Sequence, residues 1–294
     1  MKKHGSASSN RFVQPMSLAQ ALRSLPVTRL AGLEEPAVGD DVVAVEEPLE
    51  IRVGGRSVAV VMRTPGHDRE LAAGFLVTEG LVRCRDEIAD LVHCRSGAGE
   101  PNPNILDVIL APGIAVDLAR LTRHVFTSSS CGICSKASID AVRAQFAPIA
   151  PPLVPRRAVI AELPGRLRGA QTAFAATGGL HASALFDGEG RLEFVREDVG
   201  RHNALDKVIG HAFFAERLPL RGRILLVSGR VSFELMQKAL AAGIPCVAAI
   251  SAPTTAAVDF ARESGQVLVG FLRPTAGPGP AAMRMNVYAG TLAA

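Results

Sequence analysis

Apolar residues in the C-terminal half of the chain fall into short unbroken runs separated by amphipathic stretches. The runs cover residues 223–228, 245–250 and 267–272, and the stretches between them, 233–242 and 254–264, are each followed by a glycine. Short aliphatic runs are typical of buried parallel strands, and the intervening stretches have the length and period of crossover helices. We therefore predict a βαβαβ unit with right-handed crossovers.

The N-terminal half has a different pattern, in which β-rich runs surround one helical stretch. The runs that predict strands are 49–53, 57–62, 88–92 and 105–110. Gly54-Gly55-Arg56 lies between the first two runs, which favours a hairpin. Asp68 and Glu70 precede an apolar-periodic stretch over 71–79, and acidic residues stabilise a helix N-terminus. Residues 97–104, rich in Gly, Pro and Asn, predict a loop.

Composition shifts along the chain suggest three parts. Residues 1–40 are Ser-rich at the start and punctuated by proline, so we predict a mostly flexible tail with one short helix at 18–22. Prolines crowd residues 148–164, which marks a boundary. Residues 41–146 then form an N-terminal β-rich part that ends in a Cys-x-x-Cys loop and helix. Residues 165–294 form a C-terminal α/β domain.

The overall composition is that of a globular protein with an aliphatic core. Of 294 residues, 48% are hydrophobic and 20% charged, with no Trp and one Tyr. Scarce aromatics argue against single-strand nucleic-acid binding, and a scattered net charge of +4 does not indicate DNA binding. The five cysteines do not form a disulfide framework, and no apolar run approaches the roughly 20 residues of a membrane span. We expect a cytoplasmic protein with reduced thiols and no nucleic-acid or membrane partner.

Cys131-Gly132-Ile133-Cys134 is the first candidate for chemistry. Two thiols at this spacing can share a metal, form a disulfide or present a low-pKa thiolate. A zinc site needs two further ligands, and no second Cys-x-x-Cys occurs. Residues 128–130 are serines that could cap a helix predicted over 136–146, and a thiol at a helix N-terminus has a lowered pKa. We favour a reactive Cys131, while a redox pair, a metal site and simple packing remain open.

Two further constellations suit an anionic ligand. The run 196–207 is dense in Arg, Glu, Asp, His and Asn, and its His202 and Asn203 lie at the start of a helix predicted over 203–214. Two strand-to-helix turns, 227–232 and 250–255, follow parallel strands at the edge where α/β proteins bind ligands. These turns contribute the candidate residues Ser228, Gly229, Arg230 and Ser251. The alternatives are a solvated helix face for the run and ordinary helix capping for the turns.

Taken together, these stretches resemble the FdhD family of formate dehydrogenase accessory sulfurtransferases. The resemblance extends from about residue 45 to the C-terminus. The matching pieces are residues 47–51, 63–68, 73–76 with 79–80, 130–134, 179–181, 196–207, 228–230 and 251–254. The cysteine motif and the run Arg196-Glu197-Asp198-Val199-Gly200-Arg201-His202-Asn203 are together highly specific to this family.

The resemblance implies an α/β fold in which a cytidine-deaminase-like main domain, a mixed sheet flanked by helices, accompanies a smaller β-rich N-terminal part. It implies a homodimer that transfers sulfur from a cysteine desulfurase to the molybdenum bis(molybdopterin guanine dinucleotide) cofactor of formate dehydrogenase. That cofactor is a bound substrate, and no permanent metal is expected. In such proteins the first motif cysteine, here Cys131, carries a persulfide, and Cys134 assists.

The resemblance also locates the dinucleotide at the exit of a late strand. This position maps to Phe271, Leu272, Arg273, Pro274, Thr275 and Ala276. The Pro/Gly-rich stretch 274–280 departs from the family, which usually turns quickly into the final strand. Deamination is not expected, because Ser130 rather than proline precedes Cys131 and His181 lacks the following glutamate. A dithiol oxidoreductase and a cofactor-holding chaperone are the alternative functions.

Overall fold

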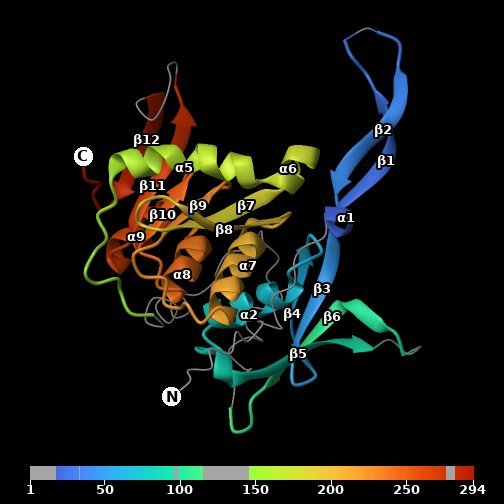
Figure 1. Cartoon of the computed structure of the whole chain (residues 1–294), viewed down its shortest axis with the longest axis horizontal. Helices are drawn as coiled ribbons and strands as arrows, with labels where there is room; N and C mark the ends of the chain where they lie inside the picture. Colours follow the sequence, from blue (N-terminus) through green and yellow to red (C-terminus); the bar gives the residue numbers. More distant parts are fainter. Residues whose placement is uncertain (1–17, 33, 96–98, 115–145, 276–281) are drawn as a thin grey trace, which may run out of the picture.

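A six-stranded mixed sheet forms the centre of the C-terminal half (Figure 1). The computed structural model describes residues 18–32, 34–95, 99–114, 146–275 and 282–294. The strands in spatial order are β12 (Met283–Ala289), β11 (Val267–Pro274), β10 (Cys246–Ala249), β9 (Ile224–Val227), β7 (His181–Phe186) and β8 (Leu192–Asp198). β9, β10 and β11 are parallel, whereas β7, β8 and β12 run antiparallel to their neighbours.

Helices cover both faces of this sheet. On one face α7 (Arg201–Phe214), α8 (Phe233–Ala241) and α9 (Thr255–Ser264) share a core with residues such as Leu225 and Val247. On the other, α5 (Arg157–Ala170) packs against Ile224 and Leu226, and α6 (Thr172–Thr177) follows it. Successive residues of β9, β10 and the first half of β11 thus point to opposite, fully buried faces, which explains the unbroken apolar runs. The predicted βαβαβ unit is confirmed.

A four-stranded sheet forms the N-terminal half, in the order β4 (Arg56–Arg63), β3 (Glu47–Val53), β6 (Pro101–Leu110) and β5 (Ile88–Arg95). Gly54 and Gly55 have φ of 57° and 80°, values that favour glycine, and they close the predicted β3–β4 hairpin. One face of this small sheet packs against α2 (Asp68–Thr78), and a short 3₁₀ helix, η1 (Arg85–Glu87), precedes β5. The prediction of these elements is confirmed, although β6 begins inside the predicted loop.

α2 and α7 join the two sheets through direct backbone contact. A Cβ on Gly74 of α2 would lie 1.8 Å from the Asp206 carbonyl oxygen, and one on Gly210 of α7 would lie 1.8 Å from the Glu70 carbonyl oxygen. No residue with a side chain fits at either crossing point. The hydrophobic core therefore continues from the small sheet through α2 and α7 into the large one.

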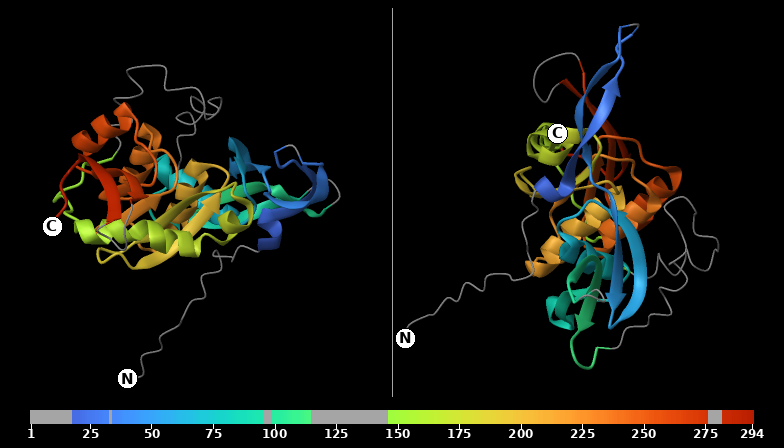
Figure 2. Two further views of the ribbon diagram at one scale, coloured as in Figure 1. Left: turned by 90° about the horizontal axis from the view of Figure 1, so that it is seen from above. Right: turned by 90° about the vertical axis from the view of Figure 1, so that its right-hand side faces the viewer.

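Residues 18–44 form an arm that projects from the body (Figure 2). The arm consists of α1 (Leu18–Ala21), β1 (Leu22–Arg29) and β2 (Ala37–Ala44), with β1 and β2 paired antiparallel. The short helix was predicted, but a flexible tail up to residue 40 does not describe these strands. Pro26 and Gly39 interrupt the alternation of apolar and polar residues that would have predicted the two strands. Antiparallel pairing of β1 with β2 holds the strands together instead.

The boundary predicted near residue 165 falls inside α5, which contains Pro164. A proline inside a helix removes one internal hydrogen bond, so the sequence pattern favoured a break. Burial of Ile160, Leu163 and Leu167 against the large sheet offsets that loss. Among the residues that the structure describes, no helix is long and apolar enough to cross a membrane.

Candidate functional site

The carboxyl ends of β9, β10 and β11 open onto one edge of the large sheet, which we call the carboxyl edge. It comprises residues 228–232 and 250–254, which follow β9 and β10, and residues 271–275, which form the end of β11 and the position after it. His181, which opens β7, and residues 198–202, from the end of β8 to the start of α7, lie at the same edge. In antiparallel β7 and β8, His181 pairs with Asp198, and Ser183 pairs with Val227 at the end of β9. The topology thus brings together the segments that the sequence singled out for an anionic ligand.

The turn after β9 packs against His181 and Arg201. The Ser228 Oγ accepts a hydrogen bond from the Ala182 amide at 2.9 Å, which ties the turn to β7. A Cβ on Gly229 would lie 3.2 Å from the His181 Nδ1 and 3.5 Å from the Arg201 Cβ. Glycine at 229 therefore lets an imidazole and an arginine approach the backbone closely. Arg230, the next residue, is exposed.

The turns after β9 and β10 lie side by side. Val231 and Pro253 form a parallel bridge, and the Thr254 amide donates to the Val231 carbonyl at 2.9 Å. Ser232 and Thr254 cap α8 and α9 through their hydroxyl oxygens. Ordinary capping thus accounts for these two hydroxyls.

The end of β11 carries an aromatic ring, Phe271, with two arginines near it. Phe271 has a φ of 54°, rare for a bulky residue, and its amide donates to the Ser251 carbonyl at 3.1 Å. The guanidinium carbons of Arg273 and Arg284 lie 5.6 and 5.8 Å from the centre of its ring. Both arginines are exposed, so their charges face solvent at this edge. Arg284, on β12, was not among the residues predicted from the sequence.

The other residues predicted at this exit differ in their surroundings. Leu272 is buried in the core beneath the edge, so its side chain faces away from solvent. Pro274 and Thr275 are exposed, and the Thr275 hydroxyl donates to the Ala282 carbonyl at 2.8 Å. Ala276 lies outside the described residues.

Two histidines at the carboxyl edge have lowered pKa values, which favour the neutral imidazole. The His202 Nε2 lies 3.2 Å from the Ser232 Oγ and 3.3 Å from the Glu234 Oε2. Burial lowers the pKa of His202 to about 4, and nearby cations act in the same direction against Glu234. Burial and then Arg201 also lower the pKa of His181. The start of α7 therefore offers one permanent cation, Arg201, beside two neutral imidazoles.

Asp198 holds the start of α7 in place through buried hydrogen bonds and an ion pair. Its carboxylate accepts hydrogen bonds from the Gly200 amide at 2.8 Å, the Asn203 Nδ2 at 2.9 Å and the Thr64 amide at 3.2 Å, and the Lys207 Nζ lies 2.7 Å away. Asp198 and Lys207 are completely buried. Asn203, predicted to bind the cofactor, also donates to the Met62 carbonyl, so both its amide hydrogens are used inside the protein.

Most of the charged run 196–207 is therefore internal structure. Glu197 accepts the amides that open α6, at 2.8 and 3.0 Å, and Asp206 lies 2.9 Å from the Lys238 Nζ. Burial would raise the pKa of Glu70, but hydrogen bonds with Arg196 and His211, and the His67 Nδ1 3.2 Å away, hold it well below its usual range. The contribution of Thr64 was missed, because no local pattern links it to a residue 134 positions away.

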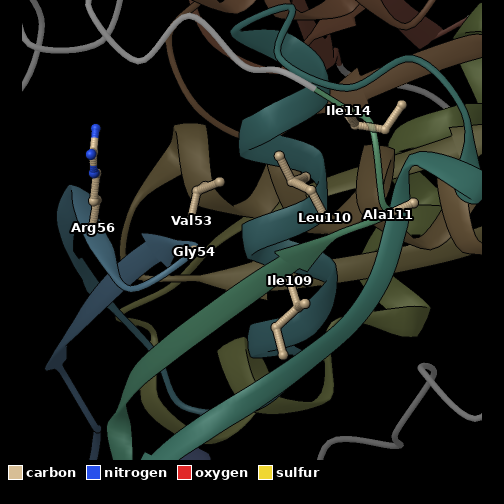
Figure 3. Close-up of a pocket in the computed structure, with 7 residues that line it drawn as sticks. All are labelled: Val53, Gly54, Arg56, Ile109, Leu110, Ala111 and Ile114. Atoms are coloured by element: carbon tan, nitrogen blue, oxygen red, sulfur yellow. The ribbon is translucent and has the colours of Figure 1, made fainter.

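Cys131 and Cys134 lie outside the described residues, so their roles remain predictions. The same holds for the helix predicted over 136–146, of which only Phe146 is described. A cavity of about 340 Å³, widely open to solvent, lies beside Ile114, the last residue of the described stretch 99–114. It is lined by Val53, Gly54, Arg56, Ile109, Leu110, Ala111 and Ile114 (Figure 3). Among the described residues, no group of His, Cys, Asp and Glu side chains could hold a metal ion.

Comparisons with known proteins identify the family. Residues 44–293 match the FdhD/NarQ family. The sulfur carrier protein FdhD of Mycolicibacterium paratuberculosis is 52% identical over 253 residues, which cover 84% of this chain and 90% of the relative. The sulfur carrier protein FdhD of Streptomyces avermitilis is 52% identical over 255 residues, with 85% and 88% covered.

A solved structure shares the fold. It is a Desulfotalea psychrophila protein described as a formate dehydrogenase accessory protein, with a TM-score of 0.70 and 24% identity. The similarity covers 92% of this chain and 98% of that protein. It supports the mixed α/β architecture, while the likeness to cytidine deaminases stays a prediction. On the family match and the identity of these relatives, the chain belongs to the FdhD/NarQ family.

Proposed function

We propose that this protein is a sulfurtransferase that carries sulfur from a cysteine desulfurase to the molybdenum bis(molybdopterin guanine dinucleotide) cofactor, on which formate dehydrogenase activity depends. The observation that carries the proposal is the cationic carboxyl edge, found in a chain about half identical to named sulfur carriers. Arg201 at the start of α7, Arg230 in the turn after β9 and Arg273 near the end of β11 come from three different segments there. A large anionic ligand suits that arrangement.

The chemistry of the cofactor fits the residues present. Its pyrophosphates suit arginine side chains and the amides at the start of α8. Its guanine base suits Phe271, a half-buried ring that already has guanidinium groups beside it. Arg273, Arg230 and Phe271 would therefore hold this substrate, while Asn203 and Leu272 support the edge from inside.

In the proposed reaction Cys131 acts as the persulfide carrier and Cys134 assists. The Cys131 thiolate attacks the terminal sulfur of a persulfide on the desulfurase. A new S–S bond forms on Cys131, the S–S bond of the donor breaks, and the donor cysteine leaves as a thiolate. The step needs no external oxidant or reductant. We expect the protein to act in the cytoplasm as a homodimer.

Mass spectrometry of the intact protein tests this function directly. After incubation with an active cysteine desulfurase and cysteine, the protein should gain the mass of one sulfur atom, and that sulfur should map to Cys131. The Cys131→Ala variant should show no such gain in mass. Formate dehydrogenase activity in cells should be lost with the same variant. A modified donor beside an unmodified Cys131 would contradict the proposal. Full cellular activity of Cys131→Ala would instead favour a chaperone, and a reversible Cys131–Cys134 disulfide of defined potential would favour an oxidoreductase.

A further inference from the structure

The arm exposes several large aliphatic side chains along its two strands and near its tip. Leu30 and Val38 near its tip are 73% and 83% exposed, and Leu25 and Val42 are 41% and 36% exposed. A two-stranded ribbon on its own is marginally stable in water, and its unpaired edges invite association. An apolar surface of this kind suits a permanent partner, because a transient one would leave it in water for much of the time.

The opposite end of the small sheet offers a complementary hollow. The cavity at the β3–β4 turn is lined mainly by aliphatic side chains, and Ile109 at its wall is 42% exposed (Figure 3). Arg56 stands at its rim, and its side chain extends away from the other lining residues. The cavity thus combines an apolar floor with one exposed cation.

The tip of the arm has the opposite charge. Glu34 and Glu35 are exposed there, between β1 and β2. Over residues 18–44 there are four carboxylates against two arginines, whereas the whole chain has a net charge of +4. Leu30 with Glu34 and Glu35 therefore matches an aliphatic cavity with Arg56 at its rim, in both polarity and charge.

Lengths along the chain match as well. β2 has eight residues and β3 has seven, and only Val45 and Glu46 separate them. At about 3.4 Å per residue, the tip and the cavity each lie roughly 25 Å from this junction. Figures 1 and 2 show the arm and the small sheet extending from it in opposite directions on the same side of the molecule. The arm therefore cannot fold back into the cavity of its own chain.

We propose that the arm tip of one copy docks in the cavity at the β3–β4 turn of a second copy, and vice versa. A two-fold axis near the junction places both tips on both cavities at once, which closes the assembly as a symmetric dimer. This interface rests on the homodimer proposed above and names the surfaces that form it. It buries the exposed leucine and valine side chains of the arm and pairs Glu34 and Glu35 with Arg56.

Charge reversal tests the interface, with sedimentation velocity of the full chain as the measurement. Reversing the tip (Glu34→Arg with Glu35→Arg) or the rim (Arg56→Glu) should raise the dimer dissociation constant roughly tenfold. In a mixture of the two variants, both contacts of the heterodimer join opposite charges. The mixture should therefore form dimers again at the wild-type concentration. Val154→Asp, at a residue 50% exposed elsewhere, is the matched control and should change nothing.

Each contrary outcome points to a different failure. A wild-type protein that stays monomeric overturns both the homodimer and this interface. A wild-type dimer that tolerates both reversals, or reversed variants that fail to associate when mixed, overturns the interface alone. Variants that keep the dimer but lose binding to formate dehydrogenase would show that another protein occupies the arm.

Discussion

Asp198 shows how a buried charge can position a site without touching its ligand. It accepts hydrogen bonds from three donors and lies 2.7 Å from the Lys207 ammonium, with no exposed surface on either residue. A buried charge of this kind is tolerated only when all its neighbours are in place. The carboxylate thereby sets the direction in which α7 begins, and with it the positions of Arg201 and His202.

Asp198→Asn should strongly destabilise the protein. The substitution removes the carboxylate charge 2.7 Å from the buried Lys207 ammonium, and breaking such a pair costs about 3–5 kcal/mol. Urea denaturation of the variant should show a loss of this size, while Glu189→Gln, at a side chain 60% exposed, should lose less than about 0.5 kcal/mol. A change at Asp198 as small as the control would mean that Lys207 has another partner.

Phe271 and Arg273 should decide how well the guanine half of the cofactor binds. We expect Arg273→Gln to weaken binding of guanosine diphosphate at least about tenfold, because one charge-assisted contact is worth about 1.5–3 kcal/mol. Phe271→Ala should cost a similar factor through lost stacking. Calorimetric titration at two salt concentrations measures both effects, and only the arginine variant should show a weaker salt dependence. Unchanged affinity in both variants would remove the nucleotide from the exit of β11.

Helix α2 meets helix α7 at two glycines, and this crossing should be intolerant of any side chain. Gly74→Ala or Gly210→Ala places a Cβ 1.8 Å from a backbone oxygen, so the helices must separate. Such overpacking costs about 1–3 kcal/mol. Gly165→Ala in α5, where a Cβ meets nothing within 4 Å, should instead stabilise by about 0.5–1 kcal/mol. Thermal unfolding of the three variants gives the opposite signs, and equal shifts would contradict the close crossing.

Elements were predictable where one local pattern dominates. The strands of the βαβαβ unit are buried on both faces, so their apolar runs stand out, and Gly243 and Gly265 mark the ends of its helices. Prediction failed where a long-range contact outweighs a local signal. The arm is held by the pairing of β1 with β2, and α5 continues through Pro164 because it packs on the sheet. The residues of the carboxyl edge could be predicted, because parallel strands always end at the same edge of a sheet. The contact of Thr64 with Asp198 could not be predicted, because it joins residues 134 positions apart.

At the scale of the whole molecule, charged motifs that seem to belong to one ligand site mostly hold the two sheets together. Asp198 binds the Thr64 amide, Arg196 binds Glu70, and Lys238 binds Thr78, each across a long stretch of chain. A dense run of charges in a sequence therefore does not by itself distinguish a binding surface from a buried interface. The distinction needs the burial of each side chain, which depends on residues far away.

Lowering the pH from 7 to 4 should remove the part of the stability of the folded protein that depends on a neutral His202. Its folded pKa of about 4 lies below the unfolded value of 6.5, so the unfolded state binds more protons between these values and stability rises with pH there. The full difference amounts to about 3 kcal/mol. Glu70, whose folded pKa is lowered, acts in the same direction below pH 4.5. His202→Gln should flatten the pH dependence of unfolding between pH 6.5 and 4, and NMR should place the His202 titration near pH 4. A titration midpoint at 6.5 or above would contradict the buried, neutral imidazole.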